Sequence, residues 1–297
     1  MDFSNLNKKT LSKVAEAKLN LFLHITGSLP SNYHSIESIF VRLKLHDTIH
    51  VTQHDTLECN VIEKNDNSNI DLHISDNIVL KVARKIQQFS GYKGGAKIYI
   101  EKNIPIAAGL GGGSSNAAST LILLNSLWNL ALNDYELHNI AKDIGADVPF
   151  FLQPHHAFVT GISDIITPIK FDRNIHLLLV NPRVETSTKR VYDDYAHSVK
   201  NGRKYTCSFK ENLIYFDKLI SDSSNDLEDS AIAIHPTILK VITMLGNSKG
   251  CIISRMSGSG STCFGIFEDE DSALNAKSTM LELEPSWWYY FETLDLS

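Results

Sequence analysis

The chain has 297 residues, of which 43% are hydrophobic, and a formal charge of −6 at pH 7. This length suits one large domain or two with a substantial core. The acidic balance argues against nucleic-acid binding, which normally shows a basic surplus. No apolar run approaches the ~18 residues that a membrane span needs. The polar N-terminus has no signal core, and the four cysteines include no close pair, so we expect a cytoplasmic protein without disulfides or membrane contact.

The first half of the chain predicts strands followed by helices. Residues 17–25 alternate apolar and other side chains, which predicts a strand with one buried face, and Lys18 and Asn20 then share the outward face. Asp76 or Asn77 is the expected cap of a helix at 78–89, and the polar stretch 63–69 is expected as a hairpin turn. The remaining elements of this half are strands at 48–53, 57–62 and 96–101, a long helix-forming run at 116–131, and a helix at 134–144. Asp134 or Asn133 is the expected cap of this last helix, which ends at Gly145.

The second half predicts short strands and helices in alternation. A polar region at 183–207 separates its first strands from a later helix, and a tight loop at 257–261 joins two further strands. The elements expected here are strands at 157–161, 176–180, 250–255, 262–267 and 287–291, and helices at 237–245 and 272–283. Such a mixture indicates an α+β architecture with two lobes.

Residues 105–120 carry the most specific motif, a glycine-rich loop that leads into a helix. Glycine permits positive φ and lets a ligand approach the main chain closely. The first amides of a helix lack partners, and its dipole is positive there, so the loop and helix start together form an anion site, most often for phosphate. A flexible turn capped by serine is the alternative, but linkers rarely end in a strong helix. The expected phosphate loop consists of Pro105, Ile106, Ala107, Ala108, Gly109, Leu110, Gly111, Gly112, Gly113, Ser114 and Ser115.

The commonest phosphate loops do not fit this stretch. A Walker A loop needs Gly-Lys-Ser/Thr, but Ser114 follows Gly113 directly. The dinucleotide fingerprint fails because its third glycine falls on Ser114, and the catalytic motifs of protein kinases are absent. The remaining pattern, Pro-x-x-x-Gly-Leu-Gly-Gly-Gly-Ser-Ser-x-Ala, resembles the phosphate loop of the GHMP kinases (galactokinase, homoserine kinase, mevalonate kinase and phosphomevalonate kinase).

Three other motifs can be explained without any function when only their local chemistry is considered. The stretch 257–262 reads as a plain turn, Lys18 as a solvated lysine, and Asp147 as a turn aspartate before a proline. Together with their flanking residues, however, all three resemble motifs of the GHMP kinases, and they occur in the expected order. The resemblance runs from about Ala17 to the last strand. It implies the two-lobed GHMP fold with the active site in the cleft between lobes, an ATP-binding domain at 1–160 and a C-terminal domain at 161–297.

The resemblance also implies roles for particular residues. Lys18 and Asp147 would flank the hydroxyl that is phosphorylated, with Asp147 as general base and Lys18 as the stabilising charge. Asn77 and Lys102 would lie near the adenine of ATP, and Mg²⁺ would bridge its phosphates, with no side chain assigned as a metal ligand. Substrate contacts are expected from Asn20, Tyr33, His34, Thr188 and Tyr192, with Tyr33 and Tyr192 sandwiching a cytosine whose edge His34 would bind.

Two of these sequence motifs indicate one branch of the family. Ala17-Lys-Leu-Asn-Leu-Phe-Leu and Tyr33-His34 resemble the GHMP kinases that phosphorylate the 2-hydroxyl of cytidine diphosphate methylerythritol in the non-mevalonate isoprenoid pathway. The expected partner is that small molecule, and the expected state is a monomer or weak homodimer. Rival interpretations are homoserine or mevalonate kinase activity, and a non-catalytic member that binds nucleotide. The intact Lys18, Asp147 and glycine-rich loops argue against the non-catalytic alternative.

Overall fold

The computed structural model describes residues 10–28, 34–63, 77–198, 213–214, 216 and 223–295. These form an α+β fold of two compact units that interleave in sequence. One unit contains residues 1–17, 44–104 and 111–154, and the other contains 18–43, 105–110 and 155–297. The predicted domain boundary after residue 160 stays a prediction.

In the first unit, three strands form an ordered sheet segment. The strand β4 (Gly95–Lys102) lies between β2 (His34–His54), which is antiparallel to it, and β3 (Leu57–Glu63), which is parallel. The connection from β3 to β4 contains α1 (Ile78–Ser90), as a parallel pair requires a crossover. Apart from Glu63, the hairpin turn predicted at 63–69 lies outside the described residues.

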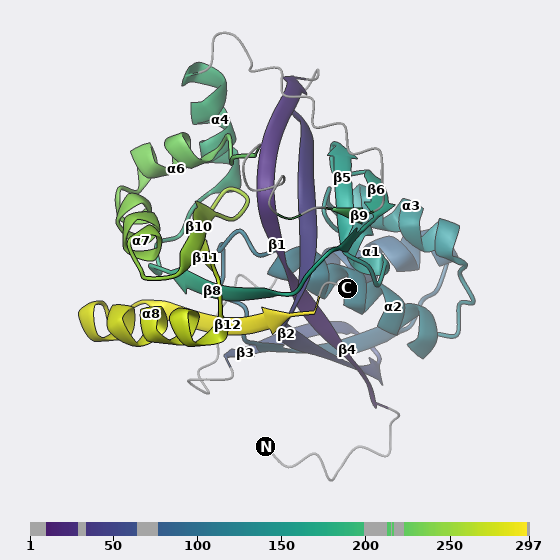
Figure 1. Ribbon diagram of the computed structural model, residues 1–297. Helices are drawn as coiled ribbons and strands as arrows, with labels where there is room; N and C mark the ends of the chain where they lie inside the picture. Colours follow the sequence, from purple (N-terminus) through teal and green to yellow (C-terminus); the bar gives the residue numbers. More distant parts are fainter. Residues whose placement is uncertain are drawn as a thin grey trace. The chain divides into compact units, whose positions relative to one another are not determined.

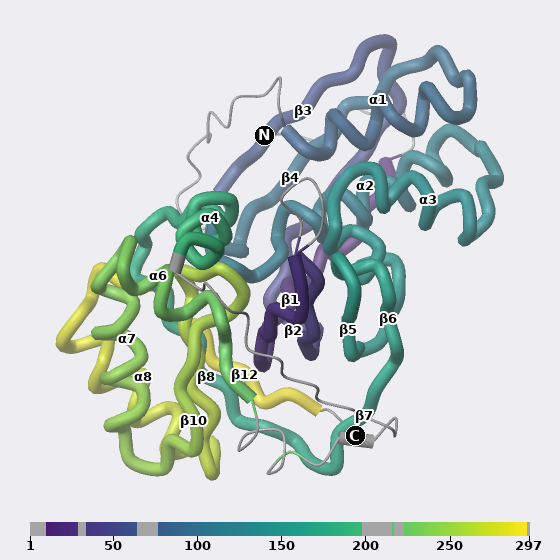
Figure 2. Tube along the Cα trace, turned by 90° about the horizontal axis from the view of Figure 1, so that it is seen from above, coloured from purple at the N-terminus to yellow at the C-terminus, as the bar shows by residue number. Residues whose placement is uncertain are grey.

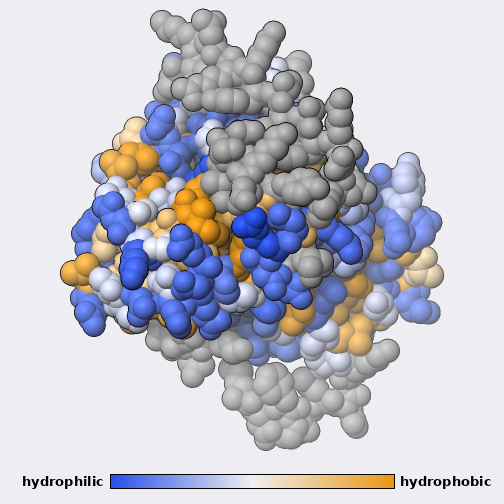
Figure 3. Space-filling view, in the orientation of Figure 1, coloured by the Kyte–Doolittle hydropathy of each residue, from blue (hydrophilic) through white to orange (hydrophobic). Residues whose placement is uncertain are grey.

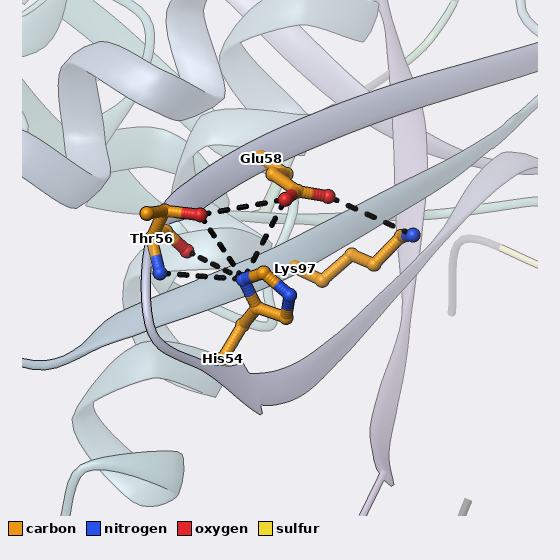
Figure 4. A network of polar contacts seen from close by, with 4 residues as sticks. All are labelled: His54, Thr56, Glu58 and Lys97. Carbon is orange, nitrogen blue, oxygen red and sulfur yellow. Dashed lines mark hydrogen bonds and ion pairs between the residues drawn. The ribbon is translucent and has the colours of Figure 1, made fainter.

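Polar side chains gather where β2 turns into β3 (Figure 4). The Nδ1 atom of His54 lies 3.3 Å from the amide nitrogen of Thr56 and 3.6 Å from Glu58 Oε1. Glu58 on β3 also lies 3.7 Å from Lys97 Nζ on β4, in the register that pairs these two residues. The network is half-exposed, so we assign it to the local geometry of this turn and not to binding.

The helices of the first unit pack side by side against one another (Figures 1 and 2). They are α1, α2 (Gly112–Leu127), α3 (Asp134–Ile144) and the short 3₁₀ helix η4 (Pro149–Leu152). The predicted caps are confirmed: Asn77 Oδ1 accepts from the amide of Val79, and Asn133 forms a reciprocal capping box with Glu136. These caps satisfy amides that the first helical turn leaves unpaired.

In the second unit, a four-stranded antiparallel sheet has the order β10-β11-β8-β12. Its strands are β8 (Ile175–Asn181), β10 (Cys251–Met256), β11 (Cys263–Phe267) and β12 (Trp288–Leu294). The helices α7 (Thr237–Gly246) and α8 (Glu270–Leu283) pack against it (Figures 1 and 2). Two further helices, α4 (Thr188–Ser198) and α6 (Glu228–Ile234), were not predicted. The sequence around α4 is polar and shows no clear helical pattern of apolar residues, and α6 has only seven residues.

In the described residues, four further strands of the second unit form an extension of β2 and a separate two-stranded ladder. The segment 36–40 of β2 pairs antiparallel with β5 (Ala157–Gly161), and β5 pairs antiparallel with β6 (Ile165–Pro168). A short parallel ladder joins β7 (Lys170–Phe171) to β9 (Leu213–Ile214). On the face drawn in Figure 3, hydrophilic residues predominate and hydrophobic ones lie in several small groups.

The long strand β1 (Thr10–Ser28) differs from its prediction in one respect. Both of its faces are buried from Lys18 to His24, whereas the alternation predicted one outward face. The neighbouring strand β2 places Ser38 and Phe40 against the second face, and Ser224 donates from its amide to His24 Nε2. The prediction was wrong because alternation reports polarity and cannot show which tertiary elements cover a polar face.

This burial makes Phe22 a sensitive position. Phe22 is 1% exposed, so Phe22→Ala should lower the free energy of unfolding by about 3–5 kcal/mol through lost burial and the cavity left behind. The control is Val14→Ala on the same strand, where the side chain is 47% exposed and the loss should stay near 0.5 kcal/mol. Urea denaturation measures both. Equal small losses would restore the outward face that the alternation predicted.

Candidate active site

The first unit supplies the helical half of the glycine-rich loop. The helix α2 begins at Gly112, and its N-cap Gly111 has φ of 67° and makes no side-chain cap hydrogen bond. The amides at its start are therefore not taken by a capping side chain, while Ser114 and Ser115 follow in the first turn. A Cβ built on Gly113 would meet no atom within 4 Å. This open, uncapped helix start has the properties of an anion site.

The second unit holds the other half of the loop through three successive carbonyl groups. The carbonyl oxygen of Ala108 accepts from the amide of Thr262 at 3.2 Å, and that of Leu110 accepts from the amide of Lys18 at 2.9 Å. Between them, Gly109 O accepts from Ser257 Oγ at 3.1 Å. The preceding Ile106 and Ala107 are exposed. The loop is thus attached to β1 and to the second glycine-rich loop (residues 257–261) through its main chain.

Only glycine fits at the centre of this attachment. Gly109 has φ of +74°, and a Cβ there would lie 2.3 Å from the carbonyl oxygen of Ser257. The opposing Gly258 lies next to β1, since its Cβ would lie 3.0 Å from Asn20 Oδ1 and 3.7 Å from Lys18 Nζ. The stretch 257–261, which its local sequence predicts as a plain turn, therefore packs directly against the first glycine-rich loop and against β1 at Lys18.

Asn225 holds the second glycine-rich loop from behind. Its Nδ2 donates to the carbonyl oxygens of Met256 and Gly258, each at 2.8 Å, and its Oδ1 accepts from the amide of Leu227. Asn225 is buried, and both polar atoms of its side chain are hydrogen-bonded. Asn225 was not predicted, because one asparagine in a polar stretch carries no signal of a contact 31 residues away.

Arg255 and Glu228 support the strand that enters this loop. Glu228 Oε2 accepts from the amide of Met256 at 2.9 Å, and Arg255 donates to Ser223 Oγ at 2.8 Å and to the carbonyl oxygen of Leu21 at 3.3 Å. Burial raises the pKa of Glu228 and lowers the pKa of Arg255 to about 10, with each opposing the shift of the other. Burial thus disfavours both charges, and the attraction between the two groups partly offsets that cost.

Lys18 and Asn20 are neighbours on one face of β1. Both are buried, and Lys18 Nζ donates to Asn20 Oδ1. The ammonium also lies 4.4 Å from the ring centroid of Phe40, a cation–π contact. Asn20 Nδ2 donates to Ser38 Oγ at 2.8 Å. Lys18 is thus buried and held in one orientation, so the interpretation as a solvated surface lysine is wrong.

Lys102 lies beside the start of α2 and is paired with a buried carboxylate. Its Nζ is 2.5 Å from Asp47 Oδ2, and it lies 3.3 Å from the position that a Cβ on Gly112 would take. Asp47 Oδ1 accepts from the amides of Asn103 at 2.7 Å and Ile104 at 2.9 Å. Asp47 therefore fixes both the lysine and the backbone that leads into the loop. Asp47 was not predicted as a site residue, because its partners lie 55 to 57 residues further along the chain.

Asp147 belongs to the first unit, whereas Lys18 belongs to the second. It lies half-buried in the turn between α3 and η4, where the amide of Val148 donates to the carbonyl oxygen of Gly145. The buried Phe150 and Phe151 anchor the segment that follows. Asn77, also in the first unit, uses its side chain to cap α1.

The expected substrate residues of the second unit form two contacts. The rings of His34 and Tyr192 have centroids 5.2 Å apart at an angle of 31°, and Tyr195 lies edge-on to His34. Thr188 Oγ1 lies 2.9 Å from Ser259 Oγ, which joins the start of α4 to the second glycine-rich loop. Burial lowers the pKa of His34, against the opposing charge of Asp193, so its imidazole is neutral at pH 7. Tyr33 lies outside the described residues.

The described part of the chain lacks both a metal-binding cluster and a membrane-spanning helix. Those residues contain no group of three or more His, Cys, Asp or Glu side chains that could hold a metal ion. None of the helices in the described ranges is long and apolar enough to cross a membrane.

Comparison with known proteins identifies the class. Residues 77–154 match the GHMP kinases N terminal domain, and residues 207–284 match the GHMP kinases C terminal domain. The chain belongs to the GHMP kinase family.

Individual relatives indicate the branch of the family to which this chain is similar. The 4-diphosphocytidyl-2-C-methyl-D-erythritol kinase of Rhodospirillum rubrum is 35% identical over 93% of this chain and 90% of its own length. The enzyme of the same name from Delftia acidovorans is 38% identical over 84% of both chains. Within the GHMP kinases, the chain falls among relatives of this name.

Solved structures agree with this placement. A 4-(cytidine 5'-diphospho)-2C-methyl-D-erythritol kinase matches with a TM-score of 0.71 and 26% identity, covering 96% of this chain and all of that one. Homoserine kinase from Cytophaga hutchinsonii and mevalonate kinase from Methanococcus jannaschii have TM-scores of 0.66 and 0.65. Their identities of 14% and 16% show a common fold alone. The predicted α+β GHMP fold is confirmed.

The attachment at Gly109 gives a matched test. Gly109 and Gly91 have φ of +74° and +73°, so an alanine at either position adopts the same unfavourable backbone, at about 1–2 kcal/mol. Only at Gly109 does the new Cβ collide with a carbonyl oxygen, whereas Gly91 has nothing within 4 Å. Gly109→Ala should therefore lose at least about 2 kcal/mol more unfolding free energy than Gly91→Ala. Equal losses in urea denaturation would contradict the close approach.

Proposed function

We propose that this chain transfers the γ-phosphoryl group of ATP to the 2-hydroxyl of 4-diphosphocytidyl-2-C-methyl-D-erythritol, giving ADP and the 2-phosphate. The observation that carries the proposal is the identity of 34–38% with curated relatives of that name over at least 84% of the chain. Homoserine and mevalonate kinases share only the fold at 14–17% identity. The reaction belongs to the non-mevalonate isoprenoid pathway, in the cytoplasm.

ATP is the donor, and the glycine-rich loop is its phosphate site. The uncapped start of α2 offers amides and a positive dipole end to the β- and γ-phosphates, and the hydroxyls of Ser114 and Ser115 lie in the same turn. Residues 105–110 supply the rest of the loop. The closeness of Lys102 to Gly112 supports a position of this lysine along the nucleotide, and Asn77 is assigned near the adenine.

Mg²⁺ fits this loop through oxygen donors. The described residues lack a dedicated cluster of acidic ligands, while phosphate oxygens, water and the hydroxyls of Ser114 or Ser115 are donors that Mg²⁺ accepts. When bound, the ion neutralises charge across the β- and γ-phosphates.

The acceptor hydroxyl is assigned to Lys18 and Asp147. Asp147 accepts the proton of the 2-hydroxyl as general base while the oxygen attacks the γ-phosphorus in line. Lys18 stabilises the negative charge on the attacking oxygen and the moving phosphoryl group. Its buried ammonium, held by Asn20 and Phe40, is already oriented and needs no reorganisation for this role.

The cytidine half of the substrate is assigned to the second unit. The contact of Tyr192 with a neutral His34 supports a shared surface that offers both an aromatic face and a nitrogen for the edge of cytosine. Thr188, Asn20 and Tyr33 complete the proposed set. The substrate is a small molecule, and the proposed state of the protein is a monomer or weak homodimer.

A substrate panel tests the proposed function. The purified full chain is incubated with Mg-ATP and, in turn, the cytidyl substrate, homoserine and mevalonate, and ADP release is followed. Turnover with the cytidyl substrate alone is expected, with the 2-phosphate found by NMR. Turnover of homoserine or mevalonate instead, or nucleotide binding with no turnover of any of the three, would overturn the proposal.

Substitutions at the proposed reacting groups give the next prediction. Lys18→Ala and Asp147→Asn should each lower kcat by at least ~10²-fold, because each removes one proton-transfer or charge-stabilising group. The double variant should be far less impaired than the product of the two, since both groups act on one transition state. The Kd of a non-hydrolysable ATP analogue, measured by calorimetry, should change little.

The matched controls are Lys81→Ala and Asp271→Asn, which remove the same groups from exposed helical positions and should leave kcat unchanged. Near-normal turnover of Asp147→Asn would end its assignment as the base.

A further inference from the structure

The buried polar groups on β1 and β2 form one chain of hydrogen bonds that ends on Lys18. Lys18 and Asn20 lie two residues apart on β1, so their side chains share a face. Lys18 Nζ donates to Asn20 Oδ1, Asn20 Nδ2 donates to Ser38 Oγ at 2.8 Å, and Ser38 Oγ donates to the carbonyl oxygen of Phe22. Lys18, Asn20 and Ser38 are 5%, 1% and 0% exposed.

The direction of this chain allows only one orientation of the Asn20 amide. An ammonium group only donates, so the amide must turn its oxygen to Lys18. Ser38 has one hydroxyl proton, and the carbonyl of Phe22 takes it, so Ser38 Oγ can only accept from Asn20 Nδ2. A flipped amide would face the ammonium with its own donor and leave the serine oxygen without a proton to accept. Ser38 therefore decides which end of Asn20 meets Lys18.

We propose that Ser38 is a positioning residue for the phosphoryl transfer, because it holds Asn20 in the orientation that directs the Lys18 ammonium. The inference rests on the proposed function, in which Lys18 stabilises the reacting charge. Its site is local to the second unit, where Asn20 is also attached through its amide nitrogen to Ser257 Oγ at 3.1 Å. In this proposal Asn20 orients Lys18 through its Oδ1 atom, in addition to the substrate contact proposed for it.

The test compares three serine variants. Ser38→Ala removes both hydrogen bonds of the hydroxyl, and Ser38→Thr keeps the hydroxyl. The control, Ser119→Ala, removes a buried hydroxyl on α2 that donates to the carbonyl oxygen of Val14, also on β1, at 3.3 Å. Ser38→Ala should lower kcat about 10- to 100-fold, the scale for a misplaced catalytic group. The Kd of the ATP analogue should stay within about twofold, Ser38→Thr should recover most of kcat, and Ser119→Ala should keep it.

A double-variant cycle separates positioning from general support of the fold. In a Lys18→Ala background, Ser38→Ala should cause no further loss of kcat, because the group that it positions is gone. An independent multiplicative loss, or equal loss of kcat and nucleotide affinity, would overturn the proposal.

Acylation of Lys18 gives a readout that does not need turnover. An amine-acylating reagent is applied to the folded full chain, and the modified peptide is quantified by mass spectrometry. Ser38→Ala should raise the rate of Lys18 modification several-fold, while Ser38→Thr and Ser119→Ala leave it unchanged. An unchanged rate in Ser38→Ala would refute the positioning role even if the substrate panel fails, whereas a raised rate together with a failed panel would reject only the proposed function.

Discussion

The close approach of two main-chain segments at Gly109 is the constraint on which the rest of the second unit's site depends. The carbonyl groups of three consecutive loop residues accept hydrogen bonds from β1 and from the second glycine-rich loop. A side chain at Gly109 would occupy the space of the Ser257 carbonyl, so the contact exists only because neither loop has a Cβ there or at Gly258. This attachment fixes the path of the phosphate loop independently of any ligand, which is the pre-organisation that phosphoryl transfer requires.

Buried charges at the site are each held by a specific partner. Lys18 is held by Asn20 and Phe40, and Lys102 by Asp47, whose other oxygen also accepts two backbone amides. Burial of an unpaired charge would cost several kcal/mol, so these partners are conditions for the lysines to lie inside at all. The two contacts differ in kind: Lys18 donates to the neutral amide of Asn20, whereas Lys102 is paired with the carboxylate of Asp47.

The shared fold does not by itself choose the substrate. Homoserine, mevalonate and galactose kinases all match this chain in structure at low identity, which agrees with the general separation of fold from function. His34 and Tyr192, which we propose as contacts of the cytidine, lie in contact in the second unit. A neutral imidazole beside an aromatic ring suits an uncharged base, whereas a small acid such as mevalonate calls for a cation.

The sequence by itself determined most of the helices, their caps and the glycine-rich loop, because propensity, capping and glycine chemistry act within a few residues of the chain. Asn77, Asn133 and the turn at Gly145 could be predicted for that reason. The burial of Lys18 and Asn20 was decided only by tertiary structure, since Ser38, Phe40 and Gly258 cover them from distant segments. The roles of Asp47, Ser38 and Asn225 were likewise decided there: each is an ordinary polar residue that hydrogen-bonds a segment 16 to 57 residues away, beyond the reach of local pattern.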